Sequence, residues 1–331
     1  MKTNRLFPSI MLAFSLLYVL LGCRTASVSE SNPLAEGRFK WGIALDGYPI
    51  TSDRLEKVEQ ETGVAADLIV FFMAWPEHGH QPAVFPLETL NAIHDYGAIP
   101  CLTWEPMYFK DGAEHAISAR AILSGKYDAY IASFARHTAQ WNKPLIIRFA
   151  HEMNLSRYHW GGTAAEYGPD SPGLYKQMFR YVVKRFRENG ANNVLWAFCP
   201  NAESVPHEAW NTIEAYYPGC DFVDVLGIDG YNWGTTQNIE KHGWNSRWQT
   251  FGEIFGSAYA ALRAMNRNKH LLIFETASVN VGGSQSQWLE DALKTSRAWD
   301  IDGMIWFHED KENDWRLQPD SARVLRRFIE K

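Results

Sequence analysis

The chain has few cysteines and no long run of basic residues. Its 331 residues include only four cysteines, and no two of them form a C-x-x-C pair, so a cysteine zinc site is not expected. Lysine and arginine number 32 against 38 aspartate and glutamate, which gives a formal net charge of −6. Because nucleic-acid binding needs clustered positive charge, no nucleic-acid partner is expected. No G-x-G-x-x-G sequence follows an apolar segment, which disfavours a dinucleotide-binding fold.

Apolar and aromatic residues, in contrast, are abundant. Hydrophobic residues make up 46% of the chain, with 18 phenylalanines, 14 tyrosines and 14 tryptophans. This composition supports a sizeable core and excludes wholesale disorder. Tryptophan can serve either as core material or as a flat apolar surface for a ligand. The length by itself admits two domains or one large barrel.

The first 22 residues have the layout of a secretory signal peptide. Two basic residues, Lys2 and Arg5, precede an apolar run over residues 6–21, which is short for a membrane-spanning helix. The run ends in LLGC, which resembles a bacterial lipobox with Cys23 as the lipidated residue. An ordinary signal peptide cleaved nearby is the alternative. We therefore expect an exported protein in the bacterial cell envelope, held to a membrane only by the lipid on Cys23, with its folded part on the non-cytoplasmic side.

The next segment has the composition of a linker. Residues 23–38 are rich in serine and contain proline and glycine, which predicts a flexible tether. The predicted organisation is thus a signal peptide over 1–22, a tether over 23–38 and one folded domain over 39–331. If a lipid occupies Cys23, an odd number of cysteines remains, and disulfide pairing among Cys101, Cys199 and Cys220 is left open.

Eight short apolar segments recur through the remaining chain. The expected strands cover residues 41–47, 67–75, 98–104, 144–150, 193–199, 223–229, 270–275 and 303–308. Helical periodicity fills intervening segments such as 127–141 and 175–186, and a last helix is expected over 320–331. Eight such units of about 34 residues each predict a single (β/α)8 barrel. An open, doubly wound sheet is the competing fold.

Polar and aromatic side chains replace aliphatic ones at the ends of these strands, where barrel enzymes keep their active sites. Aromatic rings can cover the apolar faces of sugar rings while carboxylates bind the hydroxyl groups, so a carbohydrate site is indicated. Glu152 follows the fourth strand, and Glu275 is the last residue of the seventh. Two carboxyl groups about 5 to 5.5 Å apart can cleave a glycosidic bond with retention of configuration, and this pair fits that role. For either glutamate alone, a solvated or ion-paired carboxylate is the alternative.

Three segments resemble glycoside hydrolase family 26, a group of (β/α)8 retaining enzymes best known as β-mannanases. Residues 148–154 (RFAHEMN), followed by Trp160, resemble the family's fourth-strand signature, in which histidine precedes the acid/base glutamate. Residues 273–278 (IFETAS) resemble the strand of the nucleophile, and residues 306–309 (WFHE) resemble the ending of the eighth strand. The likeness extends from about residue 41 to the C-terminus.

The resemblance implies a role for individual residues. Glu152 would be the general acid/base and Glu275 the catalytic nucleophile. His151 would support Glu152, Tyr231 would bind or orient Glu275, and Trp306 would form a platform beneath a sugar.

Position at a strand end adds further candidates for substrate binding, namely Trp104, Trp160, Trp233, Glu105 and Arg148. Each tryptophan could equally pack beneath a loop, Glu105 could belong to a structural turn, and Arg148 could bind Glu275 or neutralise buried carboxylates. His308 and Glu309 are expected to form a hydrogen-bonded wall, since a third ligand at metal spacing is not evident. No metal and no cofactor is expected.

The resemblance implies an endo-acting β-glycanase, with β-1,4-mannan or glucomannan as the first choice of substrate. Residues 229–236 (DGYNWGTT) and the segment through 314–316 also resemble the branch that cleaves mixed-linkage β-1,3-1,4-glucan, which is the alternative. A non-catalytic polysaccharide-binding lipoprotein is a more remote reading, because binding alone does not need the paired glutamates. The expected partner is a β-glycan, and the protein is expected to be a monomer.

Overall fold

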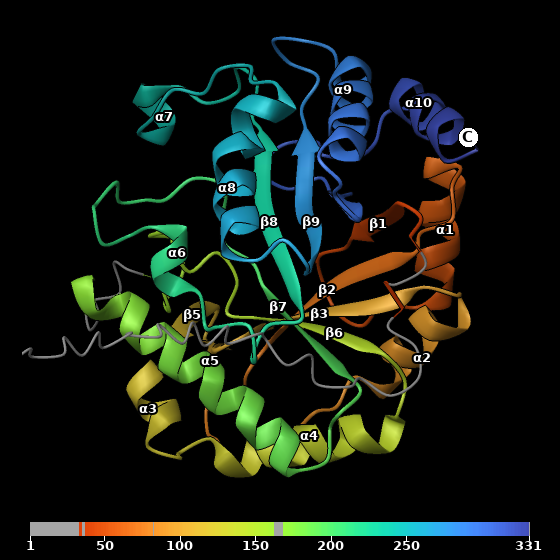
Figure 1. Ribbon diagram of the computed structural model, residues 1–331. Helices are drawn as coiled ribbons and strands as arrows, with labels where there is room; N and C mark the ends of the chain where they lie inside the picture. Colours follow the sequence, from red (N-terminus) through yellow and green to blue (C-terminus); the bar gives the residue numbers. More distant parts are fainter. Residues whose placement is uncertain (1–32, 35–36, 82, 162–167, 331) are drawn as a thin grey trace, which may run out of the picture.

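The computed structural model describes residues 33–34, 37–81, 83–161 and 168–330, which form a barrel of strands surrounded by helices (Figure 1). The barrel is closed, with eight parallel strands in the order β1-β10-β9-β8-β7-β6-β3-β2. The strands are β1 (Lys40–Ala44), β2 (Leu68–Ala74), β3 (Ile99–Glu105), β6 (Leu145–Phe149), β7 (Val194–Phe198), β8 (Val225–Asn232), β9 (His270–Ser278) and β10 (Gly303–Phe307). Each corresponds to one of the eight predicted strands, and the predicted (β/α)8 barrel is confirmed.

Helices follow the strands along the chain. They are α1 (Ser52–Thr62), α2 (Leu87–Asp95), α3 (Ala119–Leu123), α4 (Asp128–Trp141), α5 (Ser171–Glu188), α6 (Ile213–Tyr216), α7 (Ile239–His242), α8 (Phe251–Met265), α9 (Gln285–Ala298) and α10 (Pro319–Ile329). The long helices α4 and α5 lie side by side (Figure 1), where the Tyr181 hydroxyl donates to Asp128 at 2.5 Å. Both match the predicted helical segments, and α10 matches the predicted last helix. Among the described residues, no helix has the length and apolar character to cross a membrane.

The ends of several helices follow from local sequence. Thr250 precedes α8 and exchanges hydrogen bonds with Glu253, which forms a capping box that satisfies free N–H groups of the first turn. Gly63 ends α1 with a left-handed backbone, at φ 70°, a conformation that costs glycine little. These signals set where each helix begins and ends between two strands.

A two-stranded hairpin interrupts the alternation after β3. It consists of β4 (Met107–Lys110) and β5 (Ala113–Ala116), paired antiparallel. Asp111 and Gly112 form its turn, both with positive φ, as a tight hairpin requires. The sequence analysis did not predict this hairpin, although Asp-Gly between two short segments is a signal for it.

The predicted signal peptide and Cys23 lie outside the described residues. Within the predicted tether, Leu34 is described, is 2% exposed and belongs to the hydrophobic core. Cys101 and Cys199 carry free thiols and are buried.

Candidate active site

Arg148 of β6 lies at the centre of the barrel and connects three strands. Its guanidinium donates to Oδ2 of Asp229 on β8 at 2.6 Å, to Thr103 Oγ1 on β3 at 2.6 Å, and to Oε1 of Glu275 on β9. Strands β6 and β9 are not neighbours, so the contact with Glu275 crosses the barrel interior. Burial alone would lower the pKa of Arg148, but Asp229 and Glu275 raise this pKa well above its usual value. Arg148 is therefore a permanent cation that positions both carboxyl groups.

Both carboxylate oxygens of Glu275 have a donor. Arg148 binds Oε1, and the Tyr231 hydroxyl donates to Oε2 at 2.6 Å. Burial, and then the charge of Glu275, hold the pKa of Tyr231 well above its usual range, so the phenol keeps the proton that it donates. The contacts of Glu275 with Tyr231 and Arg148 that the sequence analysis considered are thus present.

A bulge in β9 aims Glu275 into the barrel. Against β8, Ile228 pairs with Ile273 and the next residue, Asp229, pairs with Glu275, so Phe274 is an extra residue. The register with β10 also shifts at this point. Phe274 lies inside, 5.6 Å from the Arg148 guanidinium, beside Gly227, where a Cβ atom would come within 2.5 Å of its ring. The bulge therefore lets two successive side chains face inward, which regular alternation forbids.

Glu152 follows β6 in an unusual backbone conformation. Ala150 and Glu152 both have φ of +49°, the left-handed region that costs a residue other than glycine about 1 to 3 kcal/mol. The amide of Glu152 donates to Cys199 O at 2.8 Å and so secures this turn. Asn201, which follows β7, donates from Nδ2 to Glu152 Oε1 at 2.5 Å. Tertiary contacts thus hold the side chain in the mouth of the barrel, where it is 7% exposed, as is Glu275.

The surroundings of Glu152 favour its protonated form. Burial, followed by the negative charge of Glu275, raises the pKa of Glu152 to about 7, although hydrogen bonding by Asn201 lowers it. Glu152 can therefore carry a proton near neutral pH while Glu275, bound by a guanidinium and a phenol, is placed to act as a carboxylate. Such a division of roles between two carboxyl groups is what acid-assisted nucleophilic attack at a sugar requires.

Asn154 is a further residue of the candidate site, to which the sequence analysis gave no role. It is fully buried, accepts from the Asn201 amide at 2.9 Å and donates to Asn201 O at 2.9 Å. Asn154 therefore positions the residue that binds Glu152. Both asparagines stand at strand ends in the sequence, which is the signal that could have identified them.

His151 precedes Glu152 in the chain and contacts Tyr158, which interacts with Glu152. Its Nε2 lies 3.0 Å from the Tyr158 hydroxyl. Burial, then the charges of Arg148 and Arg157, hold the pKa of His151 well below its usual range, so the imidazole is neutral. Tyr158 in turn is one of the groups that interact with Glu152.

Trp160 packs against both His151 and Tyr158. Its indole Nε1 donates to His151 O at 2.6 Å, and its ring stacks on Tyr158 at 4.8 Å. Trp160 is only 2% exposed, so the expectation that it contacts a sugar is not met in this structure.

Two further aromatic predictions are wrong. Trp104 is fully buried between the sheet and the helices, where Nε1 donates to Tyr130 OH at 3.1 Å. Trp306 is also fully buried, donates to Trp315 O at 2.7 Å and faces Trp288 of α9. Both side chains point away from the barrel interior, because residues at alternate strand positions face opposite sides. Neither can be a sugar platform.

Other aromatic rings lie beside Tyr231, the residue that binds Glu275. The ring of Trp315 lies 5.1 Å from that of Tyr231 and 4.9 Å from that of Trp233. Trp233 is partly exposed, so the prediction of Trp233 as a sugar contact is compatible with its position.

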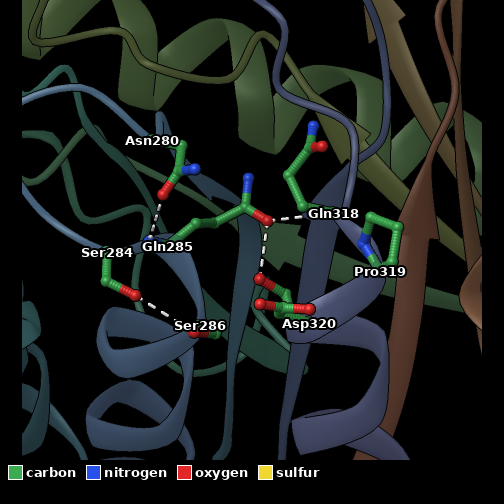
Figure 2. A pocket seen from close by; sticks show the side chains of 8 residues that line it. Asn280, Ser284, Gln285, Ser286, Gln318, Pro319 and Asp320 are labelled. Carbon is green, nitrogen blue, oxygen red and sulfur yellow. Dashed lines mark hydrogen bonds between the residues drawn. The ribbon is translucent and has the colours of Figure 1, made fainter.

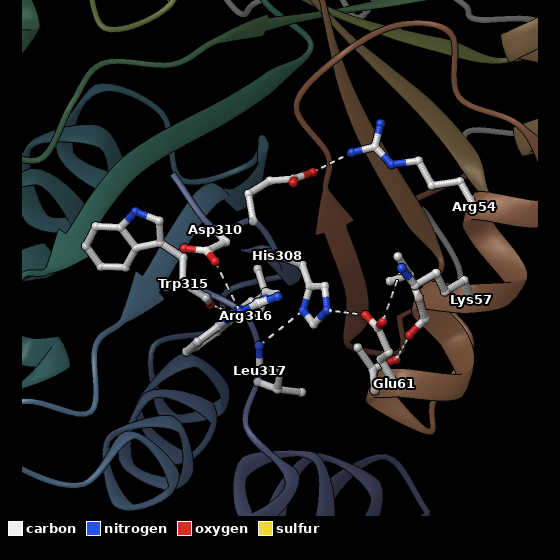
Figure 3. Close-up of polar contacts among 12 residues, drawn as sticks. Arg54, Lys57, Glu61, His308, Asp310, Trp315, Arg316 and Leu317 are labelled. Carbon is white, nitrogen blue, oxygen red and sulfur yellow. Dashed lines mark hydrogen bonds and ion pairs between the residues drawn. The ribbon is translucent and has the colours of Figure 1, made fainter. Parts of the chain in front are cut away.

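His308 and Glu309 form the predicted hydrogen-bonded wall (Figure 3). His308 Nε2 lies 3.0 Å from Glu61 on α1, and its Nδ1 accepts from the Leu317 amide at 3.1 Å. Glu309 accepts from Arg54, also on α1. These contacts tie the end of β10 to the first helix.

One group of side chains has the composition of a metal site. Ligand atoms of His151, Asp229 and Glu275 lie within 4.8 Å of one another. Both carboxylates, however, already bind Arg148. The guanidinium therefore supplies the positive charge that a metal ion would bring, and this donor set does not fit a metal.

A polar pocket lies between the start of α9 and the start of α10 (Figure 2). Neither Glu152 nor Glu275 lines it. It is lined by Asn280, Ser284, Gln285, Ser286, Gln318, Pro319, Asp320 and Ser321. Gln285 Oε1 accepts from Ser321 Oγ at 2.7 Å and from the Gln318 amide at 2.8 Å. The polar groups of the pocket thus bind one another and connect α9 to α10.

Comparison with known proteins agrees with this geometry. A model of glycosyl hydrolase family 26 matches residues 113–260. The chain is 35% identical to Endoglucanase H of Acetivibrio thermocellus over 244 aligned residues. The aligned region covers 72% of this chain and 25% of Endoglucanase H. The chain belongs to glycosyl hydrolase family 26.

The chain is also similar to a curated mannosidase and to solved mannanase structures. A mannan endo-1,4-beta-mannosidase of Bifidobacterium adolescentis is 32% identical over 35% of this chain and 12% of its own length. The chain thus spans a quarter or less of the length of these two relatives. Among solved structures, the catalytic domain of a family 26 endo-beta-1,4-mannanase from a Bacillus species superposes with a TM-score of 0.64, at 18% identity, over 89% of this chain and 86% of that one. This likeness supports the barrel fold.

Proposed function

We propose that the protein is a retaining endo-β-glycanase that hydrolyses internal β-1,4 bonds by double displacement. The observation that carries this proposal is the pairing of two unlike carboxyl groups in one barrel mouth. Glu152 has a pKa of about 7, and Glu275 is held by Arg148 and Tyr231. One group can donate a proton while the other attacks.

In the first step, a Glu275 oxygen attacks the anomeric carbon while Glu152 gives its proton to the departing glycosidic oxygen. The products are a glycosyl ester on Glu275 and an ionised Glu152. Esterification removes the charge of Glu275, which is one cause of the raised pKa of Glu152. The pKa of Glu152 therefore falls, and Glu152 becomes the base for the second step. It takes a proton from water as the water oxygen attacks the anomeric carbon and Glu275 leaves as a carboxylate.

We propose β-1,4-mannan or glucomannan as the substrate, since mannan endo-1,4-beta-mannosidases recur among the relatives. Mixed-linkage β-1,3-1,4-glucan is the second candidate. The match to Endoglucanase H favours it, because that match is longer and more identical than the match to the B. adolescentis mannosidase.

Release of reducing ends from galactomannan, glucomannan and lichenan tests the activity and ranks the substrates. We expect release by the native protein and at least a thousandfold loss in Glu152→Ala on polysaccharide and in Glu275→Ala on every substrate. Binding of these glycans without any release, by native and variant proteins alike, would instead establish a non-catalytic binding protein. NMR of the first products should show the β-anomer, and an initial α-anomer would contradict retention.

We further propose that the protein is exported to the bacterial cell envelope and attached to a membrane through a lipid on Cys23. The lipobox-like sequence at residues 20–23 supports this proposal. In Cys23→Ser the protein should move from the membrane fraction to the soluble fraction. Unchanged fractionation would contradict lipidation. Sedimentation of the released form should show a monomer.

A further inference from the structure

Glu105 is the last residue of β3, and strand geometry places it inside the barrel mouth. Thr103, two residues earlier, faces the interior, because it accepts from Arg148. Trp104, between them, faces the helices and donates to Tyr130. Because alternate residues of a strand share a face, Glu105 faces the interior with Thr103, one layer nearer to the ends of the strands.

None of the described residues forms a hydrogen bond with the carboxyl group of Glu105. The side chain is only 8% exposed, and among the described residues no hydrogen bond or ion pair reaches its carboxyl oxygens. Its carboxyl oxygens are not among the fully buried polar atoms without a partner, so they stay accessible from the mouth of the barrel. An accessible acid in this mouth, beside the proposed nucleophile and without a donor from the described residues, is placed to bind a ligand.

Burial and the surrounding charges set the protonation state in which Glu105 would bind that ligand. The charged or titratable groups that interact with it are Arg148 on β6, Glu275 on β9, Glu114 on β5, Asp46 after β1, and Arg157 and Tyr158 after β6. Burial raises the pKa of Glu105 to about 8; Arg148 opposes this rise, and the three carboxylates add to it. Below that pH the group is a neutral acid with one donor and one acceptor.

We propose that Glu105 is a specificity-determining residue that binds, as an uncharged carboxylic acid, a hydroxyl group of the sugar held at Glu275. This inference rests on the proposed glycanase function. A sugar hydroxyl can donate and accept at once, and a carboxylic acid offers the matching pair of atoms, whereas a carboxylate can only accept. A sugar that lacks a hydroxyl at this position would leave the buried acid without a partner and would bind more weakly.

Binding of mannohexaose and of a lichenan-derived oligosaccharide, measured by calorimetry, tests the proposal. The Glu152→Gln variant serves as the parent, because it should not turn over the ligand and because the titration of Glu152 is then absent. If only the protonated form of Glu105 binds, a pKa of about 8 leaves about a tenth of the protein competent at pH 9, so the Kd should rise about tenfold between pH 6 and pH 9.

Two substitutions at Glu105 separate its role from a structural one. Glu105→Gln keeps a donor and an acceptor without ionising, so it should bind as the parent does at pH 6 and lose the weakening at pH 9. Glu105→Leu should bind at least tenfold more weakly than the parent does at pH 6, with no further weakening at pH 9. Glu290→Gln is the matched control, since Glu290 lies on α9, is paired with Lys294, is not among the groups that act on Glu105 and should leave the pH dependence unchanged.

The possible results separate failure of the role of Glu105 from failure of the proposed glycanase function. An unchanged pH dependence in Glu105→Gln would overturn the proposal, as would parent-like binding by a folded Glu105→Leu variant. Absence of any glycan binding by the parent, together with absence of hydrolysis by the native protein, would refute the proposed function itself. Hydrolysis by the native protein with parent-like binding by both variants would refute only the role of Glu105.

Discussion

Replacing Glu275 with glutamine should lower the pKa of Glu152. The substitution removes a negative charge and preserves the size of the side chain. The charge of Glu275 is the second cause, after burial, of the rise in the pKa of Glu152 to about 7. In Glu275→Gln the burial of Glu152 and its hydrogen bond from Asn201 stay in place. The change in pKa therefore isolates the electrostatic coupling on which the proposed double displacement depends.

The expected size follows from the order of these causes. The pKa of Glu152 rises from an ordinary value of 4.5 to about 7, and burial is the larger contribution. We therefore expect a fall of roughly one unit, equivalent to about 1.4 kcal/mol, in Glu275→Gln. Glu152 should still titrate above its ordinary value, because its desolvation is unchanged.

Carboxyl carbon NMR of protein labelled with [13C]glutamate measures this pKa directly. The Glu152 resonance is assigned by its absence in Glu152→Gln. Glu309→Gln is the control, since Glu309 is a strand-end glutamate that binds Arg54 and should leave the titration of Glu152 unmoved. A pKa that stays near 7 in Glu275→Gln would refute the coupling. The native kcat/KM should fall as pH rises through about 7, because Glu152 must be protonated to act as the acid.

Four further predictions concern individual side chains. Tyr231→Phe removes a hydrogen bond to a carboxylate worth about 1.5 to 3 kcal/mol, so kcat should fall about 10- to 100-fold in steady-state assays with little change in thermal stability. Arg148→Met leaves two buried carboxyl groups without their cation and should cost about 3 to 5 kcal/mol of unfolding free energy in urea. Trp104→Ala should cost about 3 to 5 kcal/mol by the same measurement, whereas Trp233→Ala should raise KM and cost less than about 1 kcal/mol. The raised pKa of Glu105 means that the folded state keeps a proton that the unfolded state releases, so the unfolding free energy should fall as pH rises from about 4.5 to about 8, and this slope should be smaller in Glu105→Gln.

The eight strands and the long helices could be predicted because their patterns are local. A buried parallel strand is a short apolar run, and an amphipathic helix repeats its apolar residues at a spacing set by its geometry. The hairpin after β3 was missed because its two strands are only four residues each, too short for a periodic pattern to show. Its Asp-Gly turn was the one available signal.

The sequence by itself determined which residues stand at the ends of strands, and so which carboxyl groups could meet. It did not determine which way each side chain points. Trp104 and Trp306 are strand-end residues as predicted, yet both face the helices. At Glu275 the bulge places Phe274 and Glu275 on the same side, a departure from alternation that pairing with β8 and β10 reveals.

Only the tertiary structure decided the chemistry of the two glutamates. Their residue type is the same, and nothing local distinguishes their surroundings. Glu152 is desolvated near a negative charge and is bound by a neutral amide, whereas Glu275 receives a guanidinium and a phenol from β6 and β8. Because desolvation and Coulomb interactions depend on distance in space, residues far apart in the chain set the two roles once the barrel closes.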